Sequence, residues 1–119
     1  MKGISAYQEN SVTTQTRGRL IVLLYEGAIK FLRQALEELE AKHYVEKGQY
    51  INKAQAILVE LNSCLDLENG GEIAANLRSL YNFMSKHLSE ANTMRDPQRI
   101  REVIACLHDL NEGWKTVTA

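Results

Sequence analysis

The chain has 119 residues, of which 45% are hydrophobic and 24% are charged, and its formal net charge is -1. This length and composition predict one globular domain that buries its own core. The even charge balance argues against binding to nucleic acid or to an anionic membrane surface, because both need concentrated positive charge. We therefore expect no nucleic acid among the partners.

The N-terminus carries no basic stretch followed by an apolar run and a cleavage site, so we expect a cytoplasmic protein. The most apolar segment, residues 20–32, is about 13 residues long, whereas a membrane-spanning helix needs about 20. Glu26 and Lys30 also interrupt it, so we expect no membrane insertion. Cys64 and Cys106 lack a CxxC partner and are interpreted as reduced core thiols.

Apolar residues recur at spacings of three and four along most of the chain, which is the period of a helix. Thr16 is a candidate N-cap for the first helix, and Asp96 followed by Pro97 is one for the last. The loops between helices are short, a length that folds neighbouring helices back antiparallel. The predicted helices span about 16–41, 44–67 (or 49–67), 72–92 and 97–110.

These elements predict an all-α fold, an antiparallel up-and-down four-helix bundle over residues 16–119. Residues 1–15 form a polar arm with a few apolar residues, which has the composition for one extra helical turn and equally for a disordered tail. We treat this arm as a separate segment that could plug a binding groove.

The first predicted helix has more apolar surface than a bundle requires. On a helical wheel its apolar residues cover about 200 degrees, whereas a core-facing stripe needs about 100 degrees. Two explanations stay open. The helix packs on two neighbours, or part of the arc lines a groove for an amphipathic partner helix or for the chain's own arm.

Our candidates for partner contact are of two kinds. Some lie at or beyond the edges of the apolar stripes, and two are apolar residues of the arm spaced three apart. The alternative for the stripe positions is the core, and for Val59 and Phe83 it is incidental exposure, since single exposed apolar residues are normal. The candidates are Ile4, Tyr7, Val22, Tyr25, Ile29, Ile57, Val59 and Phe83.

The sequence contains few residues in a catalytic or metal-binding pattern. Glu40 and His43 form one Glu-x-x-His motif, but a di-metal bundle needs two such motifs and two further carboxylates. No histidine pairs with a nucleophile. We therefore expect no enzyme, no metal and no cofactor. The other histidines are interpreted as solvent-facing helical pairs, His87 with Glu90 and His108 with Glu112.

Several segments, in order and with their spacing intact, resemble the flagellin-specific export chaperone family FliS. The most specific are "LYEGAI" at 24–29 and "GGEIAANLRSLY" at 70–81. Tyr7, "VTT" at 12–14 and Trp114 also match, so the resemblance extends over nearly the whole chain.

This resemblance implies a cytoplasmic chaperone without ATP or catalysis. It implies binding of the otherwise disordered C-terminal segment of flagellin, prevention of premature polymerisation and delivery for type III export, with contact to an export gate component once loaded. It also implies that the N-terminal segment lies over part of the binding surface, where Tyr7 matches. The alternative is a structural or regulatory helical bundle that self-associates through the same apolar face, and weak self-association fits both functions.

Overall fold

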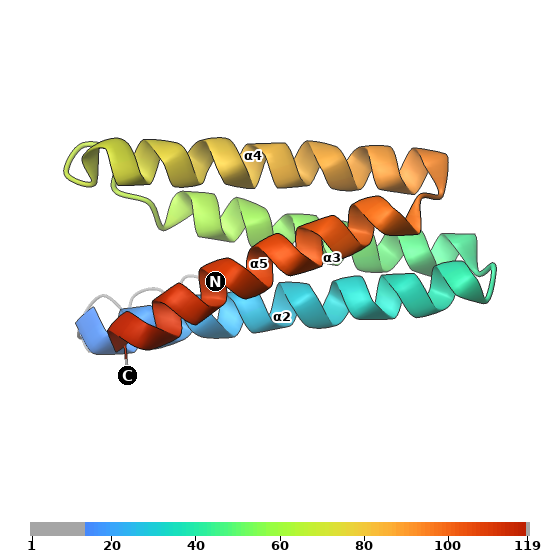
Figure 1. Ribbon diagram of the computed structural model, residues 1–119, viewed down its shortest axis with the longest axis horizontal. Coiled ribbons are helices and arrows are strands. Elements are labelled where there is room, and N and C mark those ends of the chain that lie inside the picture. Colours follow the sequence, from blue (N-terminus) through green and yellow to red (C-terminus); the bar gives the residue numbers. More distant parts are fainter. Residues whose placement is uncertain (1–13, 119) are drawn as a thin grey trace, which may run out of the picture.

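The computed structural model describes the backbone of residues 14–118 and the side chains of residues 17–116. The described chain forms four helices, each antiparallel to the one before it (Figure 1). They are α2 (Thr14–Glu40), α3 (Tyr44–Ser63), α4 (Gly71–Met94) and α5 (Pro97–Thr118). Each helix packs on two neighbours, so that α2 lies diagonally across the bundle from α4. The predicted all-α antiparallel four-helix bundle is confirmed.

Several helix ends differ from the predicted positions, most of all that of the last helix, which continues to Thr118 instead of ending near residue 110. The first helix begins at Thr14, so Thr16 lies inside it and is not its N-cap. The second helix ends at Ser63, four residues before the predicted end. The backbone tightens after Ser63, because the Leu65 N–H donates to the Asn62 oxygen three residues back at 3.2 Å. The Asp66 side chain then accepts hydrogen bonds from the backbone N–H of Asn69 at 3.1 Å and from its side-chain amide at 2.9 Å. Such a side-chain turn replaces the helical hydrogen bonds that would continue the helix.

The core is a continuous apolar cluster drawn from all four helices. Apolar residues three and four positions apart lie on one face of each helix and meet along the bundle axis. The largest fully buried side chains are Tyr25, Leu32, Ile51, Leu58, Leu61, Tyr81, Met84, Leu88, Ile100, Val103 and Leu107.

A buried lysine ties α3 to α4 at the end where α3 begins. Lys47 is only 3% exposed, and its Nζ donates hydrogen bonds to the backbone oxygen of Asn92 at 2.9 Å and to the side-chain oxygen of the same residue. Burial lowers the pKa of Lys47, and the nearby Arg95 adds to this effect. The Arg95 guanidinium lies 3.7 Å from the centroid of the Tyr44 ring, which closes this end of the bundle with a second contact.

The predicted cap of the last helix is confirmed, since the Asp96 side chain accepts a hydrogen bond from the backbone N–H of Gln98 at 3.0 Å. We expect Asp96→Ala to lower the free energy of unfolding by about 1 kcal/mol, because a backbone N–H in the first turn of α5 loses its partner. Urea denaturation measures this loss. Asp96→Asn is the matched control, because asparagine also caps helices and should retain most of the stability.

Within residues 14–118, no helix combines the length and the hydropathy that crossing a lipid bilayer requires. In the same part of the chain, no three His, Cys, Asp or Glu side chains gather in a way that could hold a metal ion.

Candidate partner-binding groove

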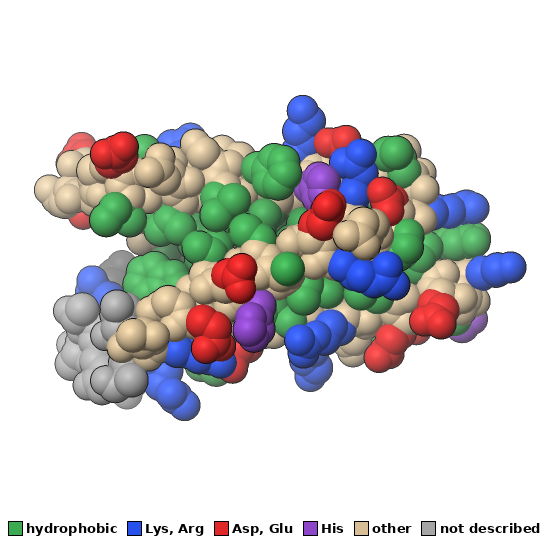
Figure 2. Space-filling view, viewed as in Figure 1, with side chains coloured by type: hydrophobic (Ala, Val, Ile, Leu, Met, Phe, Trp, Pro, Cys, Tyr) green, Lys and Arg blue, Asp and Glu red, His purple; other side chains and the backbone are tan. Residues whose placement is uncertain are grey.

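The bundle opens towards the end where α2 begins and α5 ends (Figure 1). Figure 2 shows a hollow at this end, between α4 and α5, with hydrophobic side chains on its walls. The hollow has a volume of about 330 Å³. We call it the apolar groove, and its lining residues are Ile21, Leu61, Cys64, Leu65, Asp66, Gly70, Ile73, Ala74, Leu77, Tyr81 and Trp114.

All four helices contribute to the apolar groove. Ile21 comes from α2 and Trp114 from α5, while α4, the end of α3 and the loop between them form the rest. Ile73 is 75% exposed at the start of α4, and it continues the apolar lining of the groove onto the surface. An apolar hollow with exposed apolar walls can bury the apolar side chains of a partner.

A polar chain of three aromatic side chains lies beneath the apolar groove. The Trp114 indole N–H donates a hydrogen bond to the Tyr25 hydroxyl at 3.2 Å, and the Tyr25 and Tyr81 hydroxyl oxygens are 2.5 Å apart. Burial raises the pKa of both phenols. At Tyr81 the hydrogen bond with Tyr25 raises the pKa further. The chain connects α5, α2 and α4, and thus bridges the diagonal of the bundle.

One wall of the groove depends on a glycine. A Cβ atom at Gly70 would lie 2.5 Å from the backbone oxygen of Asp66 and 2.6 Å from the Cβ of Ala74. The Gly70 N–H also donates a hydrogen bond to that same Asp66 oxygen at 2.7 Å. The loop can therefore close on the start of α4 only because position 70 has no side chain.

The structure corrects the placement of three candidates for partner contact. Val22, Tyr25 and Ile29 are 7%, 0% and 6% exposed, so they lie in the interior and not at the edge of the core. The reason is that α2 packs on both α3 and α5, which buries most of its wide apolar arc. Ile57 is half-buried, and its Cδ1 atom would lie 3.3 Å from a Cβ atom at Gly27, where α3 approaches α2 closely.

Val59 and Phe83 are exposed, at 67% and 57%. Phe83 stacks on the ring of His87, with ring centroids 5.1 Å apart and an interplanar angle of 24°. It lines a smaller hollow of about 270 Å³ between α4 and α5, and Val59 is not among the lining residues of that hollow. Neither residue lines the apolar groove.

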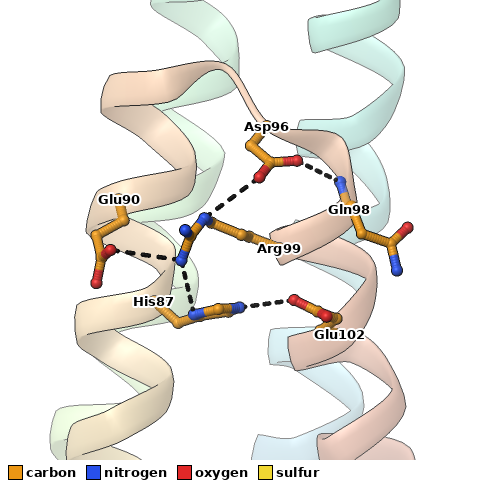
Figure 3. Close-up of polar contacts among 6 residues, drawn as sticks. All are labelled: His87, Glu90, Asp96, Gln98, Arg99 and Glu102. Carbon is orange, nitrogen blue, oxygen red and sulfur yellow. Dashed lines mark hydrogen bonds and ion pairs between the residues drawn. The ribbon is translucent and has the colours of Figure 1, made fainter.

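The predicted pair of His87 with Glu90 is wrong, because His87 joins α4 to α5 instead (Figure 3). Arg99 Nη1 lies 3.3 Å from His87 Nδ1, and an arginine can only donate. His87 Nδ1 therefore accepts, and the protonated Nε2 donates to Glu102 Oε1 at 2.8 Å. Glu90 instead lies 3.4 Å from Arg99 Nη1.

The predicted pair of His108 with Glu112 is confirmed. His108 Nε2 and Glu112 Oε1 are 3.9 Å apart on the surface of α5, and both side chains are more than half exposed. At this exposure and distance the pair contributes little to stability.

Ile4 and Tyr7 lie outside the described residues. Residues that form the walls of the apolar groove, among them Ile73, Leu77 and Trp114, are not among the predicted contacts. Ile73 and Leu77 have the spacing of an apolar helical stripe, and such a stripe does not show where the helices separate. The usable signal was the "GG" at 70–71, which places the start of α4 next to these residues.

The fold is shared with known proteins. A crystal structure described as a flagellar chaperone from bacteria superposes with a TM-score of 0.81 at 21% sequence identity, covering 98% of this chain and 95% of that chain. The flagellar secretion chaperone FliSB of Pseudomonas aeruginosa is 39% identical over 122 residues, covering 99% of this chain and 97% of its own length. The flagellar secretion chaperone FliS of Salmonella typhimurium is 39% identical over 121 residues, covering 98% and 90%.

The fold and these relatives define a class of proteins, the bacterial flagellar secretion chaperones. Residues 1–119 also match the family described as flagellar protein FliS. The chain belongs to the FliS family.

Proposed function

We propose that this protein acts in the cytoplasm, where it binds the C-terminal segment of flagellin, prevents its premature polymerisation and assists its type III export. The observation that carries the proposal is the apolar groove of about 330 Å³, which is open at one end of the bundle and has Ile73 on its rim. Free flagellin needs a partner that covers the apolar stripes it would use in the filament. The groove supplies the complementary surface.

The mode of binding we propose is capture of an amphipathic segment that becomes helical on the chaperone. Ordering a disordered chain costs much of the gross interaction energy, so a large contact surface does not require extreme affinity. Moderate affinity permits release of the client at the export gate. We propose that a component of the export gate contacts the chaperone once flagellin is bound, before this release.

The N-terminal arm is proposed to cover the groove when the client is absent, with Ile4 and Tyr7 as the covering side chains. Val59 and Phe83 remain proposed contacts outside the groove, because both are exposed on neighbouring helices. The remaining candidates then support the groove from the interior, because they pack the helices that form its walls. They are Val22, Tyr25, Ile29 and Ile57.

We expect Ile73→Glu to weaken binding of a flagellin C-terminal peptide at least about tenfold, because a carboxylate in an apolar contact must be desolvated. The titration should follow heat and peptide helicity together. Wild type should show saturable one-to-one binding with a gain in helix and a negative heat-capacity change.

Val45→Glu is the matched control for Ile73→Glu. Val45 is 71% exposed and Ile73 is 75% exposed, and each lies in the first turns of its helix, but only Ile73 lines the groove. Equal binding by the two variants would refute the groove as the client site. Failure of the folded wild-type protein to bind any flagellin peptide would refute the client.

A second candidate is self-association through the same face, which the exposure of Ile73 also favours. Sedimentation of the purified protein over a range of concentrations separates the two functions. A dimer that Ile73→Glu converts to a monomer, together with absent peptide binding, would identify the groove as a contact between copies of the chain.

A further inference from the structure

A second hollow runs along the contact between α2 and α5, and it differs from the apolar groove in chemistry. It has a volume of about 470 Å³, and the two hollows share no lining residue. Its lining residues are Glu26, Ile29, Lys30, Arg33, Gln34, Glu37, His108, Asn111 and Lys115. In Figure 2 the side chains along this side of α5 carry charges of both signs.

Asn111 occupies a position where the sequence pattern calls for an apolar residue. It follows Leu107 by four positions and precedes Trp114 by three, so it continues the stripe by which α5 faces the core. Asn111 is 3% exposed, and its side-chain oxygen accepts no hydrogen bond in the structure. A buried carboxamide oxygen without a partner is costly, and native structures rarely retain one without a ligand or water to satisfy it.

The neighbouring carboxamide has the same deficiency. Gln34 projects from α2 into the same hollow, and its side-chain oxygen is likewise buried without a hydrogen bond. Asn111 and Gln34 do not satisfy each other. Two carboxamide oxygens, one on each helix, are therefore unsatisfied beneath the surface of this hollow. Because both oxygens are buried, a rotation of the side chain would bring either of them to a group bound in the hollow.

The charges around these carboxamides indicate which group that is. The hollow is lined by three cations, Lys30, Arg33 and Lys115, and by the carboxylates of Glu26 and Glu37. Lys115 lies 3.7 Å from Glu26, whereas Lys30 and Arg33 have no carboxylate within ion-pair distance among the described residues. A carboxylate from outside would pair with both cations. A carboxamide, hydroxyl or backbone amide beside that carboxylate would satisfy Asn111 and Gln34.

We propose that the α2–α5 hollow is a docking site for an acidic segment of a partner protein, in which Asp or Glu lies next to Asn, Gln, Ser or Thr. The cations Lys30 and Arg33 hold the carboxylate, and Asn111 reads the neighbouring polar group. The site lies apart from the apolar groove, and the proposal does not rest on flagellin being the client.

The test is selection from a phage-displayed library of random peptides against the full chain, with counter-selection against the double variant Lys30→Glu/Arg33→Glu. Surviving peptides should be enriched in acidic residues next to carboxamide or hydroxyl residues. Their affinity should fall at least about tenfold for the double variant, as expected when charge pairs become repulsive. Arg78→Glu/Lys86→Glu on α4 is the matched control and should bind as wild type.

Asn111→Leu supplies an independent readout. Leucine restores the apolar stripe and removes the unsatisfied carboxamide, so the melting temperature should rise by about 3–6 °C. The selected peptides should nevertheless bind this variant at least about fivefold more weakly, because one polar contact is lost. Ile73→Glu, in the apolar groove, should leave their binding unchanged.

The outcomes that overturn the proposal are specific. They are the absence of peptides that survive counter-selection, survivors without acidic enrichment, equal binding by the double variant, and a fall in the melting temperature of Asn111→Leu. The first three would mean that the hollow does not dock an acidic segment. The last would mean that the Asn111 carboxamide is satisfied within the fold.

Discussion

Raising the pH above about 10 is expected to lower the free energy of unfolding steeply, by up to about 1.4 kcal/mol per pH unit for each of two buried phenols. Burial raises the pKa of Tyr25 and Tyr81 above the ordinary value of 10.0. Above that value the unfolded chain releases the phenol protons, whereas the folded chain keeps them. The unfolded state then binds fewer protons, so stability is retained below about pH 10 and is lost as the pH rises beyond it.

Urea denaturation between pH 8 and about pH 11.5 measures this loss. Tyr81→Phe should remove about half of the alkaline slope, because phenylalanine has no proton to release. Cys64→Ser/Cys106→Ser is the appropriate background, since burial also raises the pKa of both thiols. Lys47 has the opposite effect on the free energy of unfolding. Its pKa is lowered in the folded chain, so the unfolded chain binds the proton more tightly and stability rises with pH. An unchanged slope in Tyr25→Phe/Tyr81→Phe would show that other groups cause the alkaline loss.

Gly70→Ala is expected to lower the free energy of unfolding by about 1–3 kcal/mol, the range for overpacking at a site that cannot relax freely. The added Cβ atom would meet the Asp66 backbone oxygen at 2.5 Å, and a backbone atom cannot move aside as a flexible side chain can. Because Gly70 and Asp66 both line the apolar groove, peptide binding should weaken together with stability. Thermal unfolding and the flagellin peptide titration measure the two effects.

Gly71→Ala and Gly71→Asn separate sterics from backbone strain. A Cβ atom at Gly71 meets nothing within 4 Å, but the residue has a φ of +57°. Alanine should therefore cost about 1–2 kcal/mol through the left-handed backbone, and asparagine less, since it tolerates this conformation. A loss for Gly70→Ala no larger than that for Gly71→Asn would contradict the steric explanation.

The number, type and order of the helices could be predicted because the apolar period is a local property of the chain. Asp96 and Pro97 identified the start of α5 for the same reason, since a cap acts within one helical turn. The end of α3 could not be predicted, because the apolar spacing continues to Leu65 although the helix ends at Ser63 and leads into the Asp66 turn.

The binding surface was less accessible to sequence reasoning, because it depends on how helices are arranged around one another. The apolar arc of α2 is wider than one helix–helix contact requires, as the sequence indicates. The packing of α2 on both α3 and α5 explains why Val22, Tyr25 and Ile29 are buried. The groove arises where helices separate, and separation leaves no periodic signature. His87 shows the same limitation, because a partner 15 residues away on α5 replaced the expected one three residues away.

The order in which the helices touch has a consequence for how this protein folds. Among the four described helices, most of the packing joins helices that are consecutive in the chain, and only α2 with α5 brings distant segments together. Most native contacts are therefore local, and we expect refolding within milliseconds. The single long-range contact should be the slowest to form and the first to open. Hydrogen exchange should accordingly report shorter protection along α5 than along α3.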